Sequence, residues 1–276
     1  MYLSKAGIYM TYFKCPNCGQ ALEEQDRSYV CSKGHQFDRA KSGYVNLLMS
    51  QKDKMKQHGD DKQMVRARRD FLDKGYYGLL LEQIKNVFDK FSCKQILDAG
   101  CGECWYTESL LKPERTVYGV DISKNAVDLG SKRNSDLTLA VGSTFDLPLI
   151  SDSFDGCLSV FAPFKIEEIL RVLKEDGIFI QVFPLANHLM ELKEIVYDKP
   201  YANDVDVKMY EGFQLLDVMQ IKGPIEITST EDILNVFAMT PYAHRTPKEN
   251  IERLTQYSHL NVGLEFGLAI YRKETL

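Results

Sequence analysis

The chain has 276 residues, of which 44% are hydrophobic and 26% are charged, and its formal net charge is −5. This length allows one well-packed core with a small additional module, and the composition excludes disordered and fibrous proteins. No apolar run approaches the roughly 20 residues of a membrane span, and residues 1–12 lack the long apolar stretch of a secretory leader, so we expect none. Seven cysteines without an export signal favour metal binding or free thiols over a disulfide framework, so we expect a cytoplasmic protein.

The charge is unevenly distributed along the chain. Residues 1–75 contain 14 Lys and Arg against 9 Asp and Glu, whereas the remainder contains 20 against 30. A basic front end on an acidic body suggests that the front end meets a polyanion such as a nucleic acid. A solvated charged face would give the same count, so the pattern alone leaves both interpretations open.

The first module carries the metal-ligand spacing C-x2-C-x12-C-x3-H, formed by Cys15, Cys18, Cys31 and His35. Two knuckles of this kind make a closed tetrahedral set of three sulfurs and one nitrogen, which suits structural zinc and leaves no position for water. A module of roughly 35 residues buries too little apolar surface to fold alone, so a metal is physically needed. We therefore predict a zinc ribbon.

Two helices are predicted after a lysine-rich linker that includes Lys52, Lys54 and Lys56. The first covers 62–74 and stops at Gly75. Its apolar face holds Met64, Ala67, Phe71 and Leu72. Arg66, Arg68 and Arg69 lie mostly on the other face, where we expect them to bind the phosphates of a nucleic acid, unless they pair with Asp70 or Asp73 of the same helix. The second runs from Leu80 to Phe91 with apolar residues at helical spacing.

The chain is organised around residues 95–123, which predict a strand, a glycine turn, a helix and a second strand. Gly100 and Gly102 let the backbone approach a ligand closely, and Asp121 ends the second strand. A parallel β-α-β unit of this kind opens a crevice at the carboxyl ends of its strands, where an acid accepts hydrogen bonds from a ribose. A nucleoside ligand follows from this pattern, although an ordinary strand–helix turn also uses glycines.

The glycine spacing selects among nucleoside ligands. No third glycine completes the dinucleotide fingerprint G-x-G-x-x-G. The run D-x-G-C-G-E followed by V-D-I-S resembles the S-adenosylmethionine site of Rossmann-like methyltransferases. The resemblance implies that Gly100 and Gly102 pass under the methionine, that Asp121 binds the ribose hydroxyls, and that Asp98 and Glu103 edge the pocket.

Strands and helices continue to alternate up to residue 183, which predicts a parallel doubly wound sheet. The last two strands, near residues 213–221 and 265–273, are expected to form an antiparallel pair. Capping boxes are predicted at Ser229 with Asp232, and at Thr246 with Glu249.

The order of zinc ribbon, basic helix and methyltransferase resembles the bacterial 23S ribosomal RNA (guanine-N1)-methyltransferases nearly end to end. The segments that carry it are C-P-N-C at 15–18, Y-V-C-S-K-G-H-Q-F-D at 29–38, K-S-G-Y-V-N-L-L at 41–48, A-R-R-D-F-L-D-K-G-Y-Y at 67–77, L-D-A-G-C-G-E at 97–103, A-P at 162–163 and H-L-M-E-L-K at 188–193. The resemblance implies a seven-stranded Rossmann-like sheet with an N-terminal zinc ribbon.

The same resemblance implies a function. Such an enzyme transfers a methyl group from S-adenosylmethionine to N1 of a guanosine in a hairpin loop of 23S ribosomal RNA, and it acts as a homodimer. Zn²⁺ is held by the Cys3His set, and Tyr77, Gly102, Glu103 and His188 contact S-adenosylmethionine. One departure is Cys104, which stands where a glycine is usual and is expected to narrow the methionine end of the pocket.

The chemistry requires an extruded guanine and the loss of its N1 proton. The candidates for accepting the proton are Asp98, Glu103, Asp146 and His188, and the sequence singles out none of them. Phe161, Phe164 and Trp105 are candidates for stacking on the purine, and core packing explains each of them equally well.

Two other functions fit parts of the pattern. A small-molecule methyltransferase, for example of the quinone type, would need neither the zinc ribbon nor the basic helix. A non-catalytic zinc protein that binds RNA would need no intact cofactor site. We expect three parts: a zinc-binding extension over 1–50, a basic linker and helix over 51–75, and a methyltransferase domain over 76–276.

Overall fold

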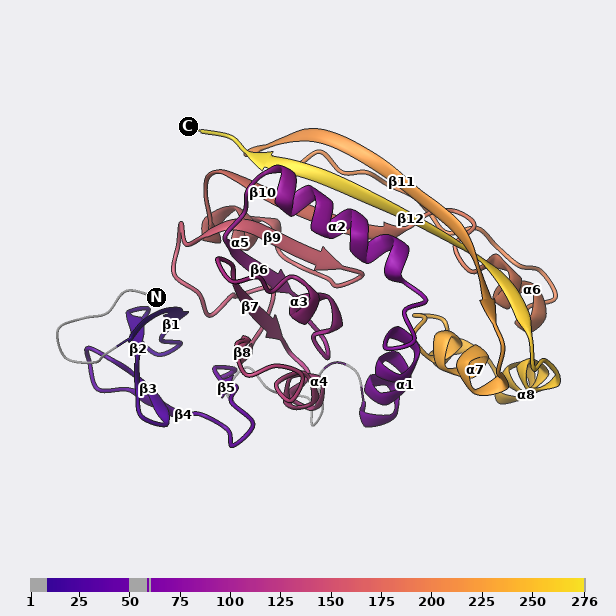
Figure 1. Ribbon diagram of the computed structural model, residues 1–276, viewed down its shortest axis with the longest axis horizontal. Helices are drawn as coiled ribbons and strands as arrows, with labels where there is room; N and C mark the ends of the chain where they lie inside the picture. Colours follow the sequence, from indigo (N-terminus) through magenta and orange to yellow (C-terminus); the bar gives the residue numbers. More distant parts are fainter. Residues whose placement is uncertain (1–8, 50–58, 60, 276) are drawn as a thin grey trace.

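The computed structural model describes residues 9–49, 59 and 61–275. Its centre is a mixed sheet in the order β11-β12-β10-β9-β6-β7-β8-β5 (Figure 1). The parallel strands are β5 (Val45–Asn46), β6 (Gln95–Ala99), β7 (Thr116–Asp121), β8 (Thr138–Val141), β9 (Phe154–Val160) and β10 (Leu173–Pro184). Antiparallel β12 (Leu260–Lys273) lies between β10 and β11 (Phe213–Ile227), and this long pair arches across the top of Figure 1.

The predicted doubly wound sheet is confirmed, and it contains one strand more than the seven expected. The additional strand is β5, which follows the zinc ribbon in sequence and pairs in parallel with β8 through Val45 and Asn46. Val45 is fully buried. A strand of two residues leaves no alternating pattern, which is why the sequence did not indicate it.

The core consists of two apolar clusters, one on each face of the sheet. They are separate because successive side chains of a strand point to opposite faces. One face is covered by α2 (Gly78–Lys90), α3 (Trp105–Ser109) and α4 (Lys124–Gly130), with α6 (Met190–Val196) and α7 (Thr230–Ala238) farther along it. The other face is covered by α5 (Ile166–Val172) and by the zinc ribbon. In the part of the chain that is described, no helix is long and apolar enough to cross a bilayer.

The zinc ribbon is a four-stranded sheet of β1 (Tyr9–Lys14), β2 (Ala21–Gln25), β3 (Ser28–Cys31) and β4 (Gln36–Asp38). Its first strand docks on the body through backbone pairing, since Phe13 bridges Leu149 and the Lys14 amide donates to the Pro148 carbonyl at 2.8 Å. Phe13 is fully buried in the same apolar cluster as Tyr118 of β7. The ribbon is therefore part of the main core.

Helix α1 (Lys62–Leu72) lies beside α7. Asp61 caps it by accepting from the amides of residues 63 and 64, and Gly75 (φ +79°) ends the turn that follows it. Lys74 then reaches Asp232 of α7 at 2.6 Å, where the carboxylate is 3% exposed. The predicted helix and its glycine stop are confirmed.

The two predicted capping boxes differ from the structure. Ser229 does cap α7 by accepting from the Asp232 amide at 3.1 Å, but the Asp232 carboxylate binds Lys74 instead of closing the box. Thr246 caps nothing, because its hydroxyl donates to the Tyr242 carbonyl at 2.9 Å. The short helix α8 (Lys248–Glu252) has no side-chain cap. A tertiary partner replaces the box at Asp232, and a local bond to the carbonyl four residues earlier replaces the cap at Thr246.

Candidate active site and metal centre

The glycine turn lies after β6, where the connections of the sheet reverse direction between β6 and β9. Gly100 has φ +89°, and a Cβ there would lie 2.3 Å from the Cβ of Ala162, so only glycine fits. The Gly102 amide donates to Oδ2 of Asp121 at 2.9 Å, and the Ser123 amide donates to Oδ1 at 2.7 Å. Asp121 is thus held against the turn at the end of β7.

Asp98 lies one strand away, at the end of β6, and only 2% of it is exposed. The Thr107 hydroxyl of α3 donates to its Oδ2 at 2.7 Å. Burial raises the pKa of Asp98 to about 7, and the nearby Asp121 charge adds to the rise. The carboxyl is therefore partly protonated at neutral pH and would be more strongly ionised beside a positive charge.

Glu103 is occupied by an arginine that follows α4. Nε of Arg133 donates to the Glu103 carboxylate at 2.7 Å and to its backbone carbonyl at 2.8 Å. Arg133 also binds Asp73 at 2.8 Å. Burial raises the pKa of Glu103, although Arg133 opposes the shift. The ion pair ties the glycine turn to its neighbours and leaves this arginine committed within the protein.

His188 faces Tyr77 across the site. Its Nδ1 accepts the Glu265 amide at 3.1 Å, so a neutral ring carries its proton on Nε2, which lies 3.5 Å from the Tyr77 hydroxyl. Burial lowers the pKa of His188 to about 4, and Lys193 contributes to the shift. Tyr77 is buried just before α2, and burial raises its pKa as well. Both groups are neutral at physiological pH.

Of the three aromatic candidates, Phe161 alone is well exposed to solvent. It follows β9, has φ +54° and is 45% exposed. Its ring plane lies 25° from that of His188, with the centroids 6.3 Å apart. Phe164 packs edge-on against Phe179, and Trp105 against Tyr106. An exposed aromatic on a strained backbone beside the glycine turn suits contact with a flat ligand.

The side chain of Cys104 does not narrow the pocket, contrary to the sequence expectation. The residue has φ +69° and no accessible surface. Its Sγ packs on α4, where a Cβ at Gly130 would lie 2.5 Å from the sulfur. Cys104 adopts the left-handed backbone conformation, and its small thiol fits because Gly130 has no side chain at that point.

The three arginines of α1 do not form one exposed basic face. Arg66 is exposed. The Arg68 guanidinium lies over the glycine turn, with Nη1 3.7 Å from the place of a Cβ on Gly102. Arg69 binds the Leu129 carbonyl at 3.4 Å and Asp73 at 3.4 Å. The predicted lysines of the linker, Lys52, Lys54 and Lys56, lie outside the described residues.

The sequence did not reveal Tyr106, whose hydroxyl is buried without a hydrogen-bond partner among the described residues. An orphaned polar atom in a core is uncommon and indicates a missing partner. The only indication of Tyr106 in the sequence was its position, one helical turn after Gly102 and next to Trp105.

The four potential metal ligands converge at the base of the ribbon, and their ligand atoms lie within 4.8 Å of one another. Nδ1 of His35 lies 3.3 Å from Sγ of Cys31 and 3.5 Å from Sγ of Cys15, and the sulfurs of Cys18 and Cys31 are 3.6 Å apart. A tetrahedron with Zn–S about 2.3 Å and Zn–N about 2.0 Å requires separations of roughly 3.5–3.8 Å. The donor set fits Zn²⁺.

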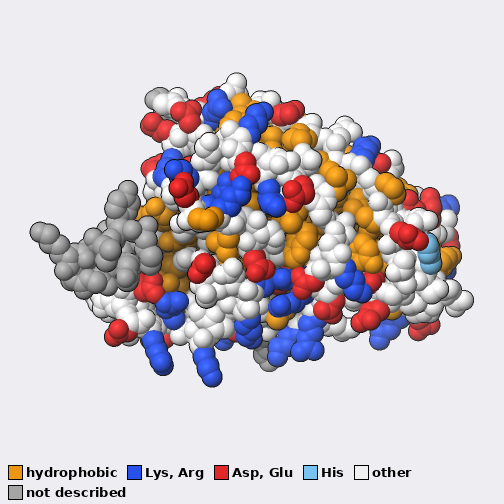
Figure 2. All heavy atoms as spheres, viewed as in Figure 1, with side chains coloured by type: hydrophobic (Ala, Val, Ile, Leu, Met, Phe, Trp, Pro, Cys, Tyr) orange, Lys and Arg blue, Asp and Glu red, His pale blue; other side chains and the backbone are white. Residues whose placement is uncertain are grey.

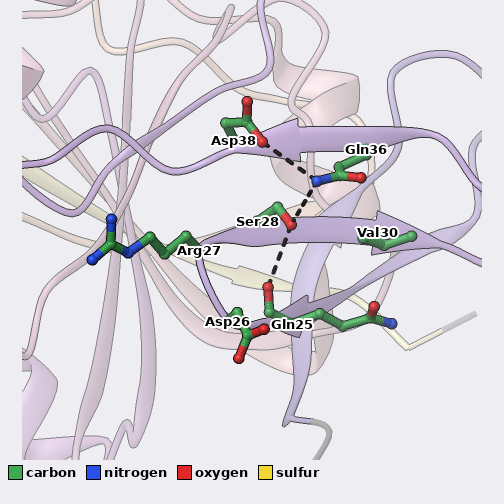
Figure 3. Close-up of a pocket in the computed structure, with 7 residues that line it drawn as sticks. All are labelled: Gln25, Asp26, Arg27, Ser28, Val30, Gln36 and Asp38. Atoms are coloured by element: carbon green, nitrogen blue, oxygen red, sulfur yellow. Dashed lines mark hydrogen bonds between the residues drawn. The ribbon is translucent and has the colours of Figure 1, made fainter.

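The ribbon also carries a shallow polar hollow away from the zinc ligands (Figure 3). Gln36 crosses it and donates to the Ser28 hydroxyl at 3.0 Å, while Arg27 points away from the other lining residues. Gln36 also approaches Asp38 at 3.5 Å, and the hollow carries no assignment.

Comparison with known proteins covers both parts of the chain. Residues 13–56 match the zinc-ribbon family model described as "RlmA, N-terminal", and residues 97–181 match one described as "Methyltransferase domain". The 23S rRNA (guanine(748)-N(1))-methyltransferase of Streptomyces fradiae is 34% identical over 89% of this chain and 90% of its own.

Two further relatives come from Bacillus subtilis. YxjB, provisionally named a 23S rRNA (guanine-N(1)-)-methyltransferase, is 27% identical over 98% of this chain and 100% of its own. The solved structure of YcgJ covers 74% of this chain and 100% of its own, with a TM-score of 0.47 and 19% identity.

Proposed function

Because the chain belongs to the family of 23S rRNA (guanine-N1)-methyltransferases, we propose that it transfers the methyl group of S-adenosylmethionine to N1 of a guanosine in a hairpin loop of 23S ribosomal RNA. The structural observation that supports this function is the glycine turn with Asp121 anchored on it, at the switch point of a sheet that also carries a zinc ribbon. Such a substrate implies action in the cytoplasm.

We assign the cofactor to the crevice bordered by Tyr77, Asp98, Gly100, Gly102, Glu103, Asp121 and His188. S-adenosylmethionine supplies an electrophilic methyl group when bound. Each oxygen of Asp121 accepts one backbone amide, which fixes the carboxylate at the end of β7, the position from which it would bind ribose hydroxyls. The Tyr106 hydroxyl, which has no hydrogen-bond partner among the described residues, fits a polar ligand near the turn.

The residues' task is chiefly to align the methyl group with guanine N1, since alignment alone can supply much of the rate enhancement. The described residues single out no proton acceptor. Glu103 is paired with Arg133, and a neutral His188 has its Nδ1 occupied and its Nε2 protonated. Asp98 is buried behind the turn, and Asp146 lies 4.0 Å from Lys14.

The zinc ribbon and its surroundings supply the basic surface that an RNA hairpin requires. Figure 2 shows Lys and Arg side chains along the lower edge of the molecule, over the ribbon, α4 and α1. The exposed basic residues of these elements include Lys33, Lys41, Lys62, Arg66, Lys124 and Lys132. We place RNA binding here, with Arg66 as the exposed member of the α1 arginines.

Two further parts of the proposal concern organisation. We divide the chain into a zinc-binding part over 1–50, a basic linker and helix over 51–75, and a methyltransferase part over 76–276. We also propose a homodimer in which paired ribbons form the RNA cleft, for which the resemblance to the family is the support.

The test is methyl transfer by the purified protein to 23S ribosomal RNA from a strain that lacks the gene. Mass mapping should locate one new N1-methylguanosine in a hairpin loop, and a panel of quinone-type metabolites should remain unmethylated. Methylation of a metabolite alone would favour the small-molecule enzyme, and binding of RNA without binding of S-adenosylmethionine would favour a scaffold.

A further inference from the structure

Lys193 is a buried charge that the proposed site does not use. It belongs to α6, which packs beside β12 (Figure 1), and its side chain has no accessible surface. Nζ donates to the Tyr201 carbonyl at 2.9 Å and to Oδ1 of Asn203 at 2.7 Å, and it lies 4.5 Å from the centroid of the Tyr201 ring. Burial lowers the pKa of Lys193, so its charged form is held at a cost in free energy. A charge that is kept inside the protein at such a cost calls for a task.

Asn203 connects this ammonium group to the loop that carries His188. Its Oδ1 accepts from Lys193, and its Nδ2 donates to the Leu185 carbonyl at 2.9 Å. The backbone amide of Asn203 donates to the Ala186 carbonyl, also at 2.9 Å. The Leu185 carbonyl in turn accepts the amide of His188 at 3.1 Å. A continuous series of hydrogen bonds therefore runs from Lys193 to the backbone of His188.

This loop places the ring of His188 in the proposed cofactor crevice. Nδ1 accepts the Glu265 amide, Nε2 lies 3.5 Å from the Tyr77 hydroxyl, and the ring stacks on Phe161. The charge of Lys193 contributes to the low pKa of His188, so the two side chains also interact electrostatically. A displacement of the loop would change the place of the imidazole ring in the crevice.

We propose that Lys193 is a positioning residue of the cofactor site, which acts through Asn203 and the backbone of His188 to hold the imidazole ring in place for S-adenosylmethionine. Asn203 belongs to a segment, residues 197–212, that forms neither helix nor strand. Because this segment has no regular backbone ladder, side-chain hydrogen bonds such as those of Lys193 are needed to anchor it. The inference rests on the proposed binding of S-adenosylmethionine and not on the identity of the RNA.

The first test measures the affinity for S-adenosylmethionine by calorimetry. Lys193→Met removes the ammonium group but keeps an unbranched side chain, and it should weaken binding about tenfold, the lower end of the losses seen when a partner that orients a histidine is removed. Asn203→Asp keeps an acceptor for Lys193 but turns a carboxylate oxygen toward the Leu185 carbonyl, so it should weaken binding by a similar factor. Lys199→Met changes an exposed lysine of the same segment and is the matched control, which should bind like the unmodified protein.

The second test separates a positioning role from a merely structural one. If Lys193 acts through His188, Lys193→Met should cause no further loss of affinity in a His188→Ala protein, since the ring that it positions is gone. NMR titration adds a direct signature. The pKa of His188 should rise in Lys193→Met because a positive neighbour is lost, and it should stay below its ordinary value because burial is the larger cause. Lys199→Met should leave this pKa unchanged.

Unchanged affinity in either Lys193→Met or Asn203→Asp would overturn the assignment, and so would a full tenfold loss on top of His188→Ala. If the Lys193→Met protein does not fold, Asn203→Asp decides, since it retains the ammonium group and an acceptor for it. Failure of the unmodified protein to bind S-adenosylmethionine would instead refute the proposed function, and this inference with it.

Discussion

Two carboxylates of the cofactor site have opposite environments. Asp121 accepts two backbone amides, whereas Asp98 is buried with a single hydroxyl donor. The two residues are therefore suited to different tasks. Asp121 provides fixed lone pairs for hydroxyl groups, and Asp98 provides a charge whose presence depends on pH and on the ligand.

Asp98 should make cofactor affinity depend on pH. A sulfonium favours the ionised carboxylate, and the pKa of about 7 means that ionisation costs free energy below neutrality. Affinity for S-adenosylmethionine should therefore rise by up to about tenfold between pH 6 and pH 8. Asp98→Asn should abolish this part of the rise. Calorimetry of both proteins cancels the titration of the ligand's own amino group, and identical pH profiles would contradict the role.

Asp121 should contribute to affinity through hydroxyl groups of the ligand. Asp121→Ala removes the ribose acceptor and also frees the Gly102 amide that orders the turn. We expect a loss of about 1–3 kcal/mol in the binding of S-adenosylmethionine, as is usual when a charged hydrogen bond is removed. A matched change at the exposed Asp70 should leave binding unaltered. Unchanged affinity in Asp121→Ala would reject the assignment.

At the scale of elements, the zinc ribbon and the body share one apolar cluster. Phe13, Leu22 and Tyr29 of the ribbon lie in the same cluster as Tyr118 and Phe154 of the sheet. Backbone pairing at Leu149 and strand β5 add two further attachments. Loss of the metal should consequently destabilise the body of the protein as well as the ribbon.

Cys18→Ser should lose zinc and lower the melting temperature of the whole protein. The exposure of shared core residues should cost about 2–3 kcal/mol, which corresponds to roughly 5–10 °C for a chain of this size. Metal analysis and calorimetric melting measure both effects, and Ser32→Ala in the same knuckle is the control. Full zinc in the Cys18→Ser protein, or a separate unchanged melting transition of the body, would contradict this coupling.

The sequence correctly predicted the elements that have a local sequence pattern. It did not predict the features that depend on contacts with distant parts of the chain. The glycine turn, the helix ending at Gly75 and the alternation of strands and helices follow from local pattern and are confirmed. Strand β5 and the partners of Asp232 depend on segments roughly 90 to 160 residues away, as the contacts to Val141 and Lys74 show. Helical spacing placed Arg68 beside Arg66, but only the packing of α1 showed that it faces the glycine turn.

At the scale of the whole molecule, charge is separated between an acidic body and a basic edge. The chain after residue 75 carries ten more acidic than basic residues, and it should repel phosphates on average. Basic residues of the ribbon, α4 and α1 lie along one edge in Figure 2. Long-range attraction should therefore orient an RNA hairpin toward this edge before the base reaches the site.

Replacement of Lys62 and Arg66 together by alanine should weaken RNA binding and its dependence on salt. Both residues are exposed on α1. Each lost phosphate contact flattens the logarithmic plot of affinity against salt by roughly 0.7–0.9, so the slope should fall by about 1.4–1.8 in this variant. Affinity for S-adenosylmethionine should stay unchanged, and Arg253→Ala should keep the original slope. An unaltered slope in the double variant would contradict this role. It would show that Lys62 and Arg66 are solvated or form only surface ion pairs, each of which contributes under about 1 kcal/mol.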